Sequence, residues 1–239
     1  MCGQCGCDEP QAAPLPQRRL ELHQPLLSRN DNQAARNRDH FKRHGLRTIN
    51  LLSAPGSGKT ALLEQLARHW PRPRIGVIVG DLATDNDARR LQAAGVQAVQ
   101  ITTGQACHLE AAMVADGLHR LQHDGVVLEQ LELLVIENVG NLVCPAAYDL
   151  GEAQRVVLLS VTEGEDKPLK YPATFHSADV VVISKIDLAE VVGFDVAHAR
   201  RHIERVAPRA RIVELSARTG AGMDALLEAL ALERLPACA

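Results

Sequence analysis

Residues 53–60, SAPGSGKT, carry the strongest structural signal in this chain of 239 residues. An apolar run at 47–53 (RTINLLS) precedes them, and a segment of helical period at 58–69 follows them. In such a strand–turn–helix unit the glycines let backbone N–H groups curl around phosphate oxygens, and the helix N-terminus adds its dipole. The pattern is that of a phosphate-binding loop (P-loop), except that Ser53 stands where the first glycine is usual.

The residues of this loop have separate expected roles. Lys59 reaches the β- and γ-phosphates of a bound nucleotide, and Thr60 ligates Mg²⁺. A chance glycine turn is the alternative, and the flanking strand and helix argue against it. The nucleotide-binding residues expected here are Gly56, Ser57, Gly58, Lys59, Thr60 and Ala61.

Apolar β-branched runs alternate with helical segments along the rest of the chain. This alternation predicts an α/β fold with a mostly parallel, doubly wound seven-stranded sheet, whose functional loops lie at the C-terminal strand ends. The expected strands are 47–53, 74–80, 96–101, 131–136, 155–161, 179–184 and 210–215, and the expected helices include 58–69, 105–122, 195–206 and 222–234.

The N-terminal part of the chain has a different composition. Residues 1–30 combine proline, glutamine and charged residues without a sustained apolar period, which predicts a flexible arm. Residues 31–239 form the predicted P-loop domain, which begins with a short polar helix at 31–45 that Gly45 ends.

Composition disfavours several classes of protein. The net charge of −3 argues against a nucleic-acid binder, which would show a clustered basic excess. The N-terminus has no basic n-region or long apolar run, so we expect no signal peptide, and no apolar stretch approaches the ~20 residues that cross a bilayer. We therefore expect a soluble, cytoplasmic protein, in whose reducing compartment thiols serve as metal ligands or redox groups rather than disulfides.

The segment 184–187, SKID, favours guanine as the base of the nucleotide. Asp187 can accept hydrogen bonds from both N1 and N2 of guanine, a donor pair that adenine does not offer. GTPases usually have NKxD here, so Ser184 in place of asparagine weakens the match but keeps the carboxylate. A second element, SARTG (216–220), follows the last strand, and together the two favour GTP over ATP. The expected base-pocket residues are Lys185, Asp187, Ser216 and Ala217.

Two groups of cysteines suggest metal binding. Cys107 and His108 are expected at the start of a helix, and Cys144 in a loop after the strand 131–136, so all three face the nucleotide edge. Thiolate and imidazole suit Ni²⁺ and Zn²⁺, although a buried cysteine alone is more often structural. The second group, Cys2, Cys5 and Cys7, is either a frayed tail or a metal clamp; three thiolates favour square-planar Ni²⁺ and leave Zn²⁺ or Cu(I) open.

Other candidate ligands carry less weight. His119 and His123, and likewise His198 and His202, are spaced i,i+4 but have no thiol or carboxylate partner placed by the sequence. We expect both pairs on solvated helix faces. Cys238 has no partner at metal-binding spacing.

With these motifs the sequence resembles the HypB family, the nickel-inserting GTPases of nickel–iron hydrogenase maturation. The resemblance covers 47–235 as a G domain and adds the N-terminal cysteines. Its most distinctive mark is Glu137-Asn138-Val139-Gly140, where most GTPases have DxxG. The other shared marks are SAPGSGKT, GDLATDNDARR (80–90), ACH (106–108), IENVGNLVCP (136–145) and SVTEGEDKPLKYP (160–172).

The resemblance implies slow GTP hydrolysis used as a switch. Lys59 and Thr60 act on the phosphates and Mg²⁺, Asp81 contacts either the magnesium shell or the attacking water, and Glu137 and Gly140 sense the γ-phosphate. GTP draws two subunits into a homodimer, and hydrolysis to GDP releases it and lowers metal affinity, because nucleotide and metal binding are reciprocally linked.

The resemblance also implies metals and partners. The family's high-affinity nickel motif, CxxCGC, is matched by Cys2, Cys5 and Cys7, which favours the clamp. Ni²⁺ or Zn²⁺ binds the Cys107, His108 and Cys144 group near the subunit interface. The implied partners are a small zinc-containing, nickel-binding maturation protein of the HypA type and the hydrogenase large subunit.

Three rivals remain at this stage. The urease nickel chaperone carries Cys-Pro-His, whereas Ala146 follows Pro145 here. A small-molecule kinase shares the P-loop but has no use for SKID, and a non-enzymatic metal sensor explains the thiols but not the P-loop.

Overall fold

The computed structural model describes residues 18–69, 75–81, 86–104 and 106–230, and for residues 18–26 and 69 it describes the backbone alone. Cys2, Cys5 and Cys7, and also Cys238, lie outside these ranges. Among the helices described, none is long and apolar enough to cross a bilayer.

A single parallel sheet forms the centre of the molecule. Its strand order is β3-β2-β4-β1-β5-β6-β7, and each pair of neighbouring strands is parallel. The seven expected strands are all present, with slightly shifted ends, which confirms the doubly wound α/β fold. The strands are β1 (Arg47–Ser53), β2 (Ile75–Asp81), β3 (Gln97–Thr102), β4 (Leu133–Glu137), β5 (Gln154–Ser160), β6 (Val180–Ser184) and β7 (Arg211–Leu215).

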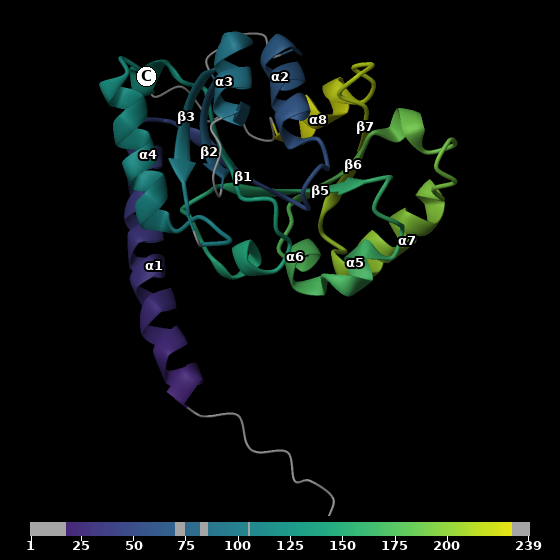
Figure 1. Cartoon of the computed structure of the whole chain (residues 1–239), viewed down its shortest axis with the longest axis horizontal. Coiled ribbons are helices and arrows are strands. Elements are labelled where there is room, and N and C mark those ends of the chain that lie inside the picture. Colours follow the sequence, from purple (N-terminus) through teal and green to yellow (C-terminus); the bar gives the residue numbers. More distant parts are fainter. Residues whose placement is uncertain (1–17, 70–74, 82–85, 105, 231–239) are drawn as a thin grey trace, which may run out of the picture.

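Helices cover both faces of this sheet (Figure 1). One face carries α2, α3 and α8, and the other carries α1, α4, α6 and α7. The helices are α1 (Arg18–Arg43), α2 (Lys59–His69), α3 (Asn86–Ala93), α4 (Ala111–His123), α5 (Lys167–Lys170), α6 (Pro172–His176), α7 (Val196–Val206) and α8 (Met223–Leu230), with 3-10 turns η1 (Leu128–Gln130), η2 (Cys144–Ala147) and η3 (Ile186–Leu188).

Aliphatic side chains fill the interior on both sides of the sheet. Alternate strand residues point to opposite faces, so Leu133 and Val135 pack under α2, α3 and α8, whereas Leu134 and Ile136 pack under α1 and α4. On this second face the core is divided into two clusters, one under α1 and α4 and one under α6 and α7. Buried Thr48 and Asn50 of β1 lie on this face, so polar side chains enter the core there.

The first helix is longer than the sequence indicates. Instead of a flexible arm to residue 30 and a helix over 31–45, α1 begins at Arg18 and ends at Arg43, before Gly45 at φ +64°. Polar side chains hold it in place: Asn37 donates to the carbonyls of Ala111 and Leu150 at 2.7 and 3.0 Å. Tertiary hydrogen bonds therefore stabilise a helix whose composition shows little apolar periodicity.

The start of α4 also differs from the expectation. We predicted a helix over 105–122 with Cys107 and His108 at its start, but α4 begins at Ala111 and both residues lie in the preceding loop. The Ala106 N–H bonds the Thr103 carbonyl, and the Leu109 N–H bonds the Asn138 side chain at 3.1 Å. These contacts keep the backbone of 106–109 out of the helix.

Candidate functional site

The P-loop uses Ser53 as its internal anchor. The Ser53 hydroxyl accepts hydrogen bonds from the Ser57 hydroxyl at 2.5 Å and from Lys59 Nζ at 3.0 Å. Gly56 and Gly58 have φ of +71° and +99°, the left-handed region that favours glycine. The residue that departs from the usual motif thus fixes the loop and orients Lys59, a role that the motif match did not indicate.

Carboxylates gather around Thr60 and Lys59. The Thr60 hydroxyl donates to Asp87 Oδ1 at 2.9 Å, and Asp87 is a residue that the sequence analysis did not single out. Its signal was its place in the first turn of α3, a few residues after Asp81 at the end of β2. These oxygen donors are of the kind that Mg²⁺ prefers.

Glu137 is the buried member of this acidic group. Only 2% of its surface is exposed. Burial raises the pKa of Glu137 to about 7, Asp87 and Asp81 add to the rise, and Lys59 and Thr60 oppose it. Among the described residues its Oε2 has no hydrogen-bond partner. The carboxyl is therefore poised to change its protonation state or its partners when a ligand enters.

The 137–140 turn lies directly against the P-loop. A Cβ at Gly140 would come within 3.1 and 3.2 Å of the Pro55 backbone, closer than ordinary van der Waals contact. Glycine is required there because the two backbones approach so closely. This contact places the turn beside the phosphate loop, as a γ-phosphate sensor needs.

Three of the four expected base-pocket residues, Lys185, Asp187 and Ala217, line a cavity of about 350 Å³, whereas Ser216 is fully buried and does not line it. Lys185, at φ +59°, donates from Nζ to the Gly56 carbonyl at 2.7 Å, and Ser184 donates to the Ser57 carbonyl at 2.8 Å. The replacement of asparagine by Ser184 thus keeps a link between SKID and the P-loop. The cavity is lined by Ser57, Gly58, Ala61, Leu62, Ser184, Lys185, Asp187, Leu188, Leu215, Ala217 and Arg218.

Asp187 already has partners within this cavity. A hydrogen bond from Ser216 holds the pKa of Asp187 below its usual range, and Arg218 adds to this effect. Arg218 Nε lies 2.9 Å from Asp187 Oδ2, although the Arg218 side chain is 75% exposed. Arg218 is a further residue that the sequence analysis missed, and a bound base would have to replace it on the carboxylate.

The three predicted soft ligands of the domain come together. The ligand atoms of Cys107, His108 and Cys144 all lie within 4.8 Å of one another, and within the described part of the chain no other such group of three appears. Cys107 and His108 come from the loop before α4, and Cys144 begins η2. Asn141 ties the two loops together by donating to the Cys107 carbonyl at 3.2 Å.

The environment of these ligands sets their protonation. Burial lowers the pKa of His108, which favours the neutral imidazole that binds metals. The Cys144 contact, followed by burial, raises the pKa of the Cys107 thiol. The His108 ring stacks on Tyr148 with 3.9 Å between centroids, a contact that the sequence did not reveal. The three ligand side chains are already close together, so metal binding would mainly have to displace the thiol protons.

The remaining histidine pairs differ from this group. His198 and His202 lie side by side, but the Nδ1 of His202 bonds the Glu165 carbonyl at 2.8 Å. The side chain of His123 is 91% exposed. Neither pair belongs to a three-ligand group among the residues described.

Comparisons with known proteins identify the family of this chain. A family model described as CobW/HypB/UreG, nucleotide-binding domain, matches residues 47–214. The hydrogenase maturation factor HypB of Azotobacter chroococcum mcd 1 is 50% identical over 215 residues, 86% of this chain and 66% of that protein, so this chain spans about two thirds of its relative.

Two further matches cover more of the relative. The hydrogenase/urease maturation factor HypB of Helicobacter pylori is 46% identical over 204 residues, 85% of this chain and 84% of that protein. A crystal structure of HypB from Helicobacter pylori in complex with nickel superposes with a TM-score of 0.80 at 45% identity, covering 84% of this chain and 95% of the other. The seven-stranded P-loop fold, the matched family model and these identities show that this chain belongs to the HypB family.

Proposed function

We propose that this protein is a GTP-hydrolysing nickel metallochaperone that delivers Ni²⁺ to the large subunit of a nickel–iron hydrogenase during its maturation. One observation carries the proposal: the P-loop and the Cys107, His108 and Cys144 group lie at the same edge of the sheet, at the two ends of the segment 137–144. A nucleotide pocket and a soft-metal site joined in this way suit a protein whose metal affinity follows its nucleotide.

The nucleotide roles follow from the contacts. Lys59 would leave Ser53 to neutralise the β- and γ-phosphates, and the glycine turn would supply backbone N–H donors. Asp187 would accept from guanine while Lys185 lies beside the base. Mg²⁺, when bound, would be held through the Thr60 hydroxyl and would neutralise phosphate charge, and Asp81 and Glu137 would complete the polar surroundings.

The metal group suits a shared site between two subunits. Three ligands from one chain leave a coordination sphere short, and a C2 dimer brings a residue near the axis against its own copy. Val143, next to Cys144, is 64% exposed, so an apolar side chain faces outward beside the ligands. We propose that GTP favours a homodimer in which Ni²⁺, or Zn²⁺ in competition, lies at this interface.

The N-terminal cysteines supply the second metal site of the proposal. Cys2, Cys5 and Cys7 precede α1, whose later residues contact Ala111 and Leu150 close to the metal loops. A clamp on this segment would hold nickel before its transfer, and a small protein of the HypA type is the implied partner. The transfer partner and the hydrogenase subunit come from the family resemblance.

Phosphate release and sedimentation test the proposal together. Purified protein should hydrolyse GTP in preference to ATP, and a non-hydrolysable GTP analogue with Ni²⁺ should shift it from monomer to dimer. Cys144→Ala should lose the interface metal and the metal-dependent part of this shift, whereas Cys238→Ala, a matched thiol control, should keep both. Equal use of ATP and GTP, or unchanged metal content in Cys144→Ala, would overturn the proposal.

A further inference from the structure

A fully buried side chain connects the 137–140 turn to the loop that carries Cys107 and His108. Asn138 has no exposed surface. Its Oδ1 accepts from the Leu109 N–H at 3.1 Å and from the Val139 N–H at 3.0 Å. Leu109 directly follows His108, so a single amide oxygen holds the first metal loop against the turn that follows Glu137.

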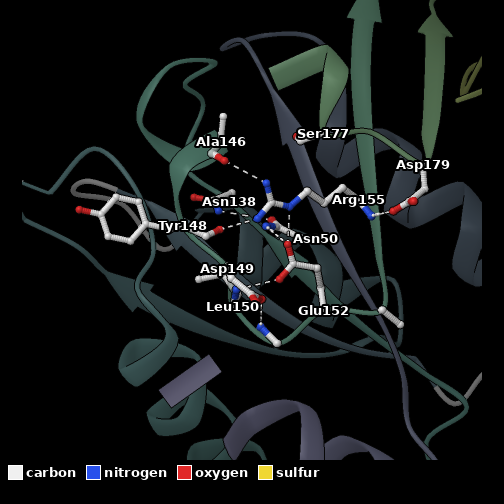
Figure 2. A network of polar contacts seen from close by, with 12 residues as sticks. Asn50, Asn138, Ala146, Tyr148, Asp149, Leu150, Glu152, Arg155, Ser177 and Asp179 are labelled. Atoms are coloured by element: carbon white, nitrogen blue, oxygen red, sulfur yellow. Dashed lines mark hydrogen bonds and ion pairs between the residues drawn. The ribbon is translucent and has the colours of Figure 1, made fainter. Parts of the chain in front are cut away.

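The nitrogen of the same amide begins a second connection. Asn138 Nδ2 donates to Asn50 Oδ1 at 3.3 Å, and Asn50 Nδ2 donates to Glu152 Oε1 at 3.3 Å. The other oxygen of Glu152 accepts from the Leu150 N–H at 2.8 Å. This chain of contacts runs across β1, on the sheet face where the two hydrophobic clusters are separated (Figure 2).

The second connection ends at the other metal loop. Arg155 Nε donates to Glu152 Oε1 at 2.6 Å, and its two terminal nitrogens donate to the carbonyls of Ala146 and Tyr148 at 2.9 and 2.7 Å (Figure 2). Ala146 belongs to η2, which begins at Cys144, and Tyr148 stacks on His108. Arg155 thus holds the backbone on both sides of Ala147, close to the second ligand loop.

We propose that Asn138 and Arg155 are positioning residues that set the spacing between the Cys107–His108 loop and Cys144 and change it with the bound nucleotide. This inference rests on the proposed function, because it identifies the residues through which nucleotide and nickel affect each other. Neither residue lines the nucleotide cavity or belongs to the three-ligand group.

The physical reason is the cost of breaking buried hydrogen bonds. A buried polar group that loses its partner pays its full desolvation penalty, so the bonds of such a network persist when the backbone at one end of it shifts. When a γ-phosphate displaces the 137–140 turn, the Leu109 backbone is drawn along by Asn138, while Arg155 keeps the Ala146 and Tyr148 carbonyls in place. The distance between ligands on the two loops then changes with the nucleotide.

The test measures nickel affinity in two nucleotide states. The full-length chain with Cys2, Cys5 and Cys7 replaced by alanine leaves the Cys107, His108 and Cys144 group as its one predicted thiolate site. Ni²⁺ is titrated with GDP and with a non-hydrolysable GTP analogue, and the thiolate-to-nickel absorption band reports ligand geometry. The variants are Asn138→Ala and Arg155→Lys, which keeps the charge but loses the planar fork.

Arg47→Lys is the matched control. Arg47 Nη1 also donates to a carbonyl, that of Leu230, at 2.8 Å, but it lies at the start of β1, away from the metal loops. In the parent chain and in Arg47→Lys the two nucleotide states should differ in nickel affinity by at least about fivefold. In Asn138→Ala and Arg155→Lys the ratio should fall below about twofold, and the absorption band should become the same in both states.

The double variant adds a further criterion. Because both residues act through one network, combining them should change the ratio no more than either change alone. Folded variants that keep the parent ratio would overturn the inference, and if Asn138→Ala does not fold, Arg155→Lys decides. A parent chain with equal nickel affinity in both states would instead overturn the linkage in the proposed function.

Discussion

The nucleotide pocket and the metal loops are neighbours at one sheet edge but are built differently. The nucleotide pocket is lined by residues of three short contiguous segments, 57–62, 184–188 and 215–218. The metal group consists of three side chains on two loops, which Asn138, Asn141 and Arg155 hold together. The shape of the pocket is therefore set by the residues that line it. The geometry of the metal group is set by residues that are not themselves metal ligands.

Lys59→Ala tests the first half of this contrast and should have the largest effect. Removing the cation that we propose to face the β- and γ-phosphates should lower the rate of GTP hydrolysis at least about 100-fold, as expected for loss of a main transition-state contact. Without nucleotide, nickel affinity at the Cys107, His108 and Cys144 group should stay within about twofold of the parent value. Phosphate release and nickel titration measure the two effects.

Lys170→Ala serves as the control for that variant. The Lys170 side chain is 62% exposed and pairs with Asp166 at 2.8 Å, away from both sites, so neither activity should change. A large fall in nickel affinity of nucleotide-free Lys59→Ala would show that the pocket and the metal loops are not separately built.

Glu137→Gln probes the residue at which the two regions meet. Its carboxyl has a folded-state pKa of about 7 because of burial, above the usual 4.5, so the folded protein binds the proton more tightly than the unfolded chain. The stability gained from the neutral acid is complete below pH 4.5 and is lost as the pH rises through about 7. At pH 8 the neutral amide should therefore make the nucleotide-free protein more stable, by at most about 3 kcal/mol.

Denaturant unfolding across this pH range measures the effect. The variant and the parent should have similar unfolding free energies near pH 4.5 and diverge toward pH 8, and Glu190→Gln, at an exposed position, should follow the parent throughout. Parallel curves for Glu137→Gln and the parent would mean that this carboxyl is ionised in the folded protein at neutral pH.

Asp187→Asn changes the base preference of the pocket. The amide offers guanine N1 and N2 one acceptor and a clashing donor, and it matches xanthine better. Losing a charged hydrogen bond costs on the order of 1.5–3 kcal/mol, so GTP affinity should fall roughly ten- to a hundredfold while xanthosine triphosphate affinity rises. Fluorescent-nucleotide competition measures both, with exposed Asp224→Asn as control; unchanged GTP affinity would contradict the role of SKID.

Much of the fold follows from local sequence signals. The β-branched runs predicted all seven strands because a parallel strand buried on both faces has few other compositions. The predicted start of α1 was wrong because tertiary contacts reach into the expected arm: Asn30 donates to the Asp149 carbonyl at 2.7 Å and accepts from the Ala111 N–H at 2.8 Å. The start of α4 was wrong for a related reason, since Asn138 captures the Leu109 N–H. Polar tertiary contacts leave no periodic pattern in the sequence.

The candidate site shows the same division. Motifs alone predicted four residues of the pocket, because each follows a strand within a few residues. These residues are Lys59, Thr60, Lys185 and Asp187. The gathering of Cys107, His108 and Cys144 was predicted from strand ends, and their ligand atoms are indeed close. Arg155 and Tyr148 carry no motif, and only the structure reveals their contacts with the metal loops. The clamp of Cys2, Cys5 and Cys7 stays a prediction.

Arg218→Ala should have the smallest effect, and it compares two arginines rather than two regions. The Arg155 side chain is only 16% exposed and makes three bonds to groups near the metal loops, whereas the Arg218 side chain is 75% exposed and bonds Asp187. An exposed ion pair is worth at most about 1 kcal/mol and weakens with salt.

A guanine base that binds Asp187 must displace the Arg218 contact, so Arg218→Ala should tighten GDP binding by at most about fivefold at low salt, and the gain should shrink as salt rises. Fluorescent-nucleotide titration at two salt concentrations measures this, and Arg200→Ala, which breaks an exposed pair with Glu214, should leave GDP affinity unchanged. Weaker GDP binding in Arg218→Ala would instead mean that the guanidinium contacts the bound nucleotide, and the pocket would then depend on an exposed side chain as much as the metal group depends on buried ones.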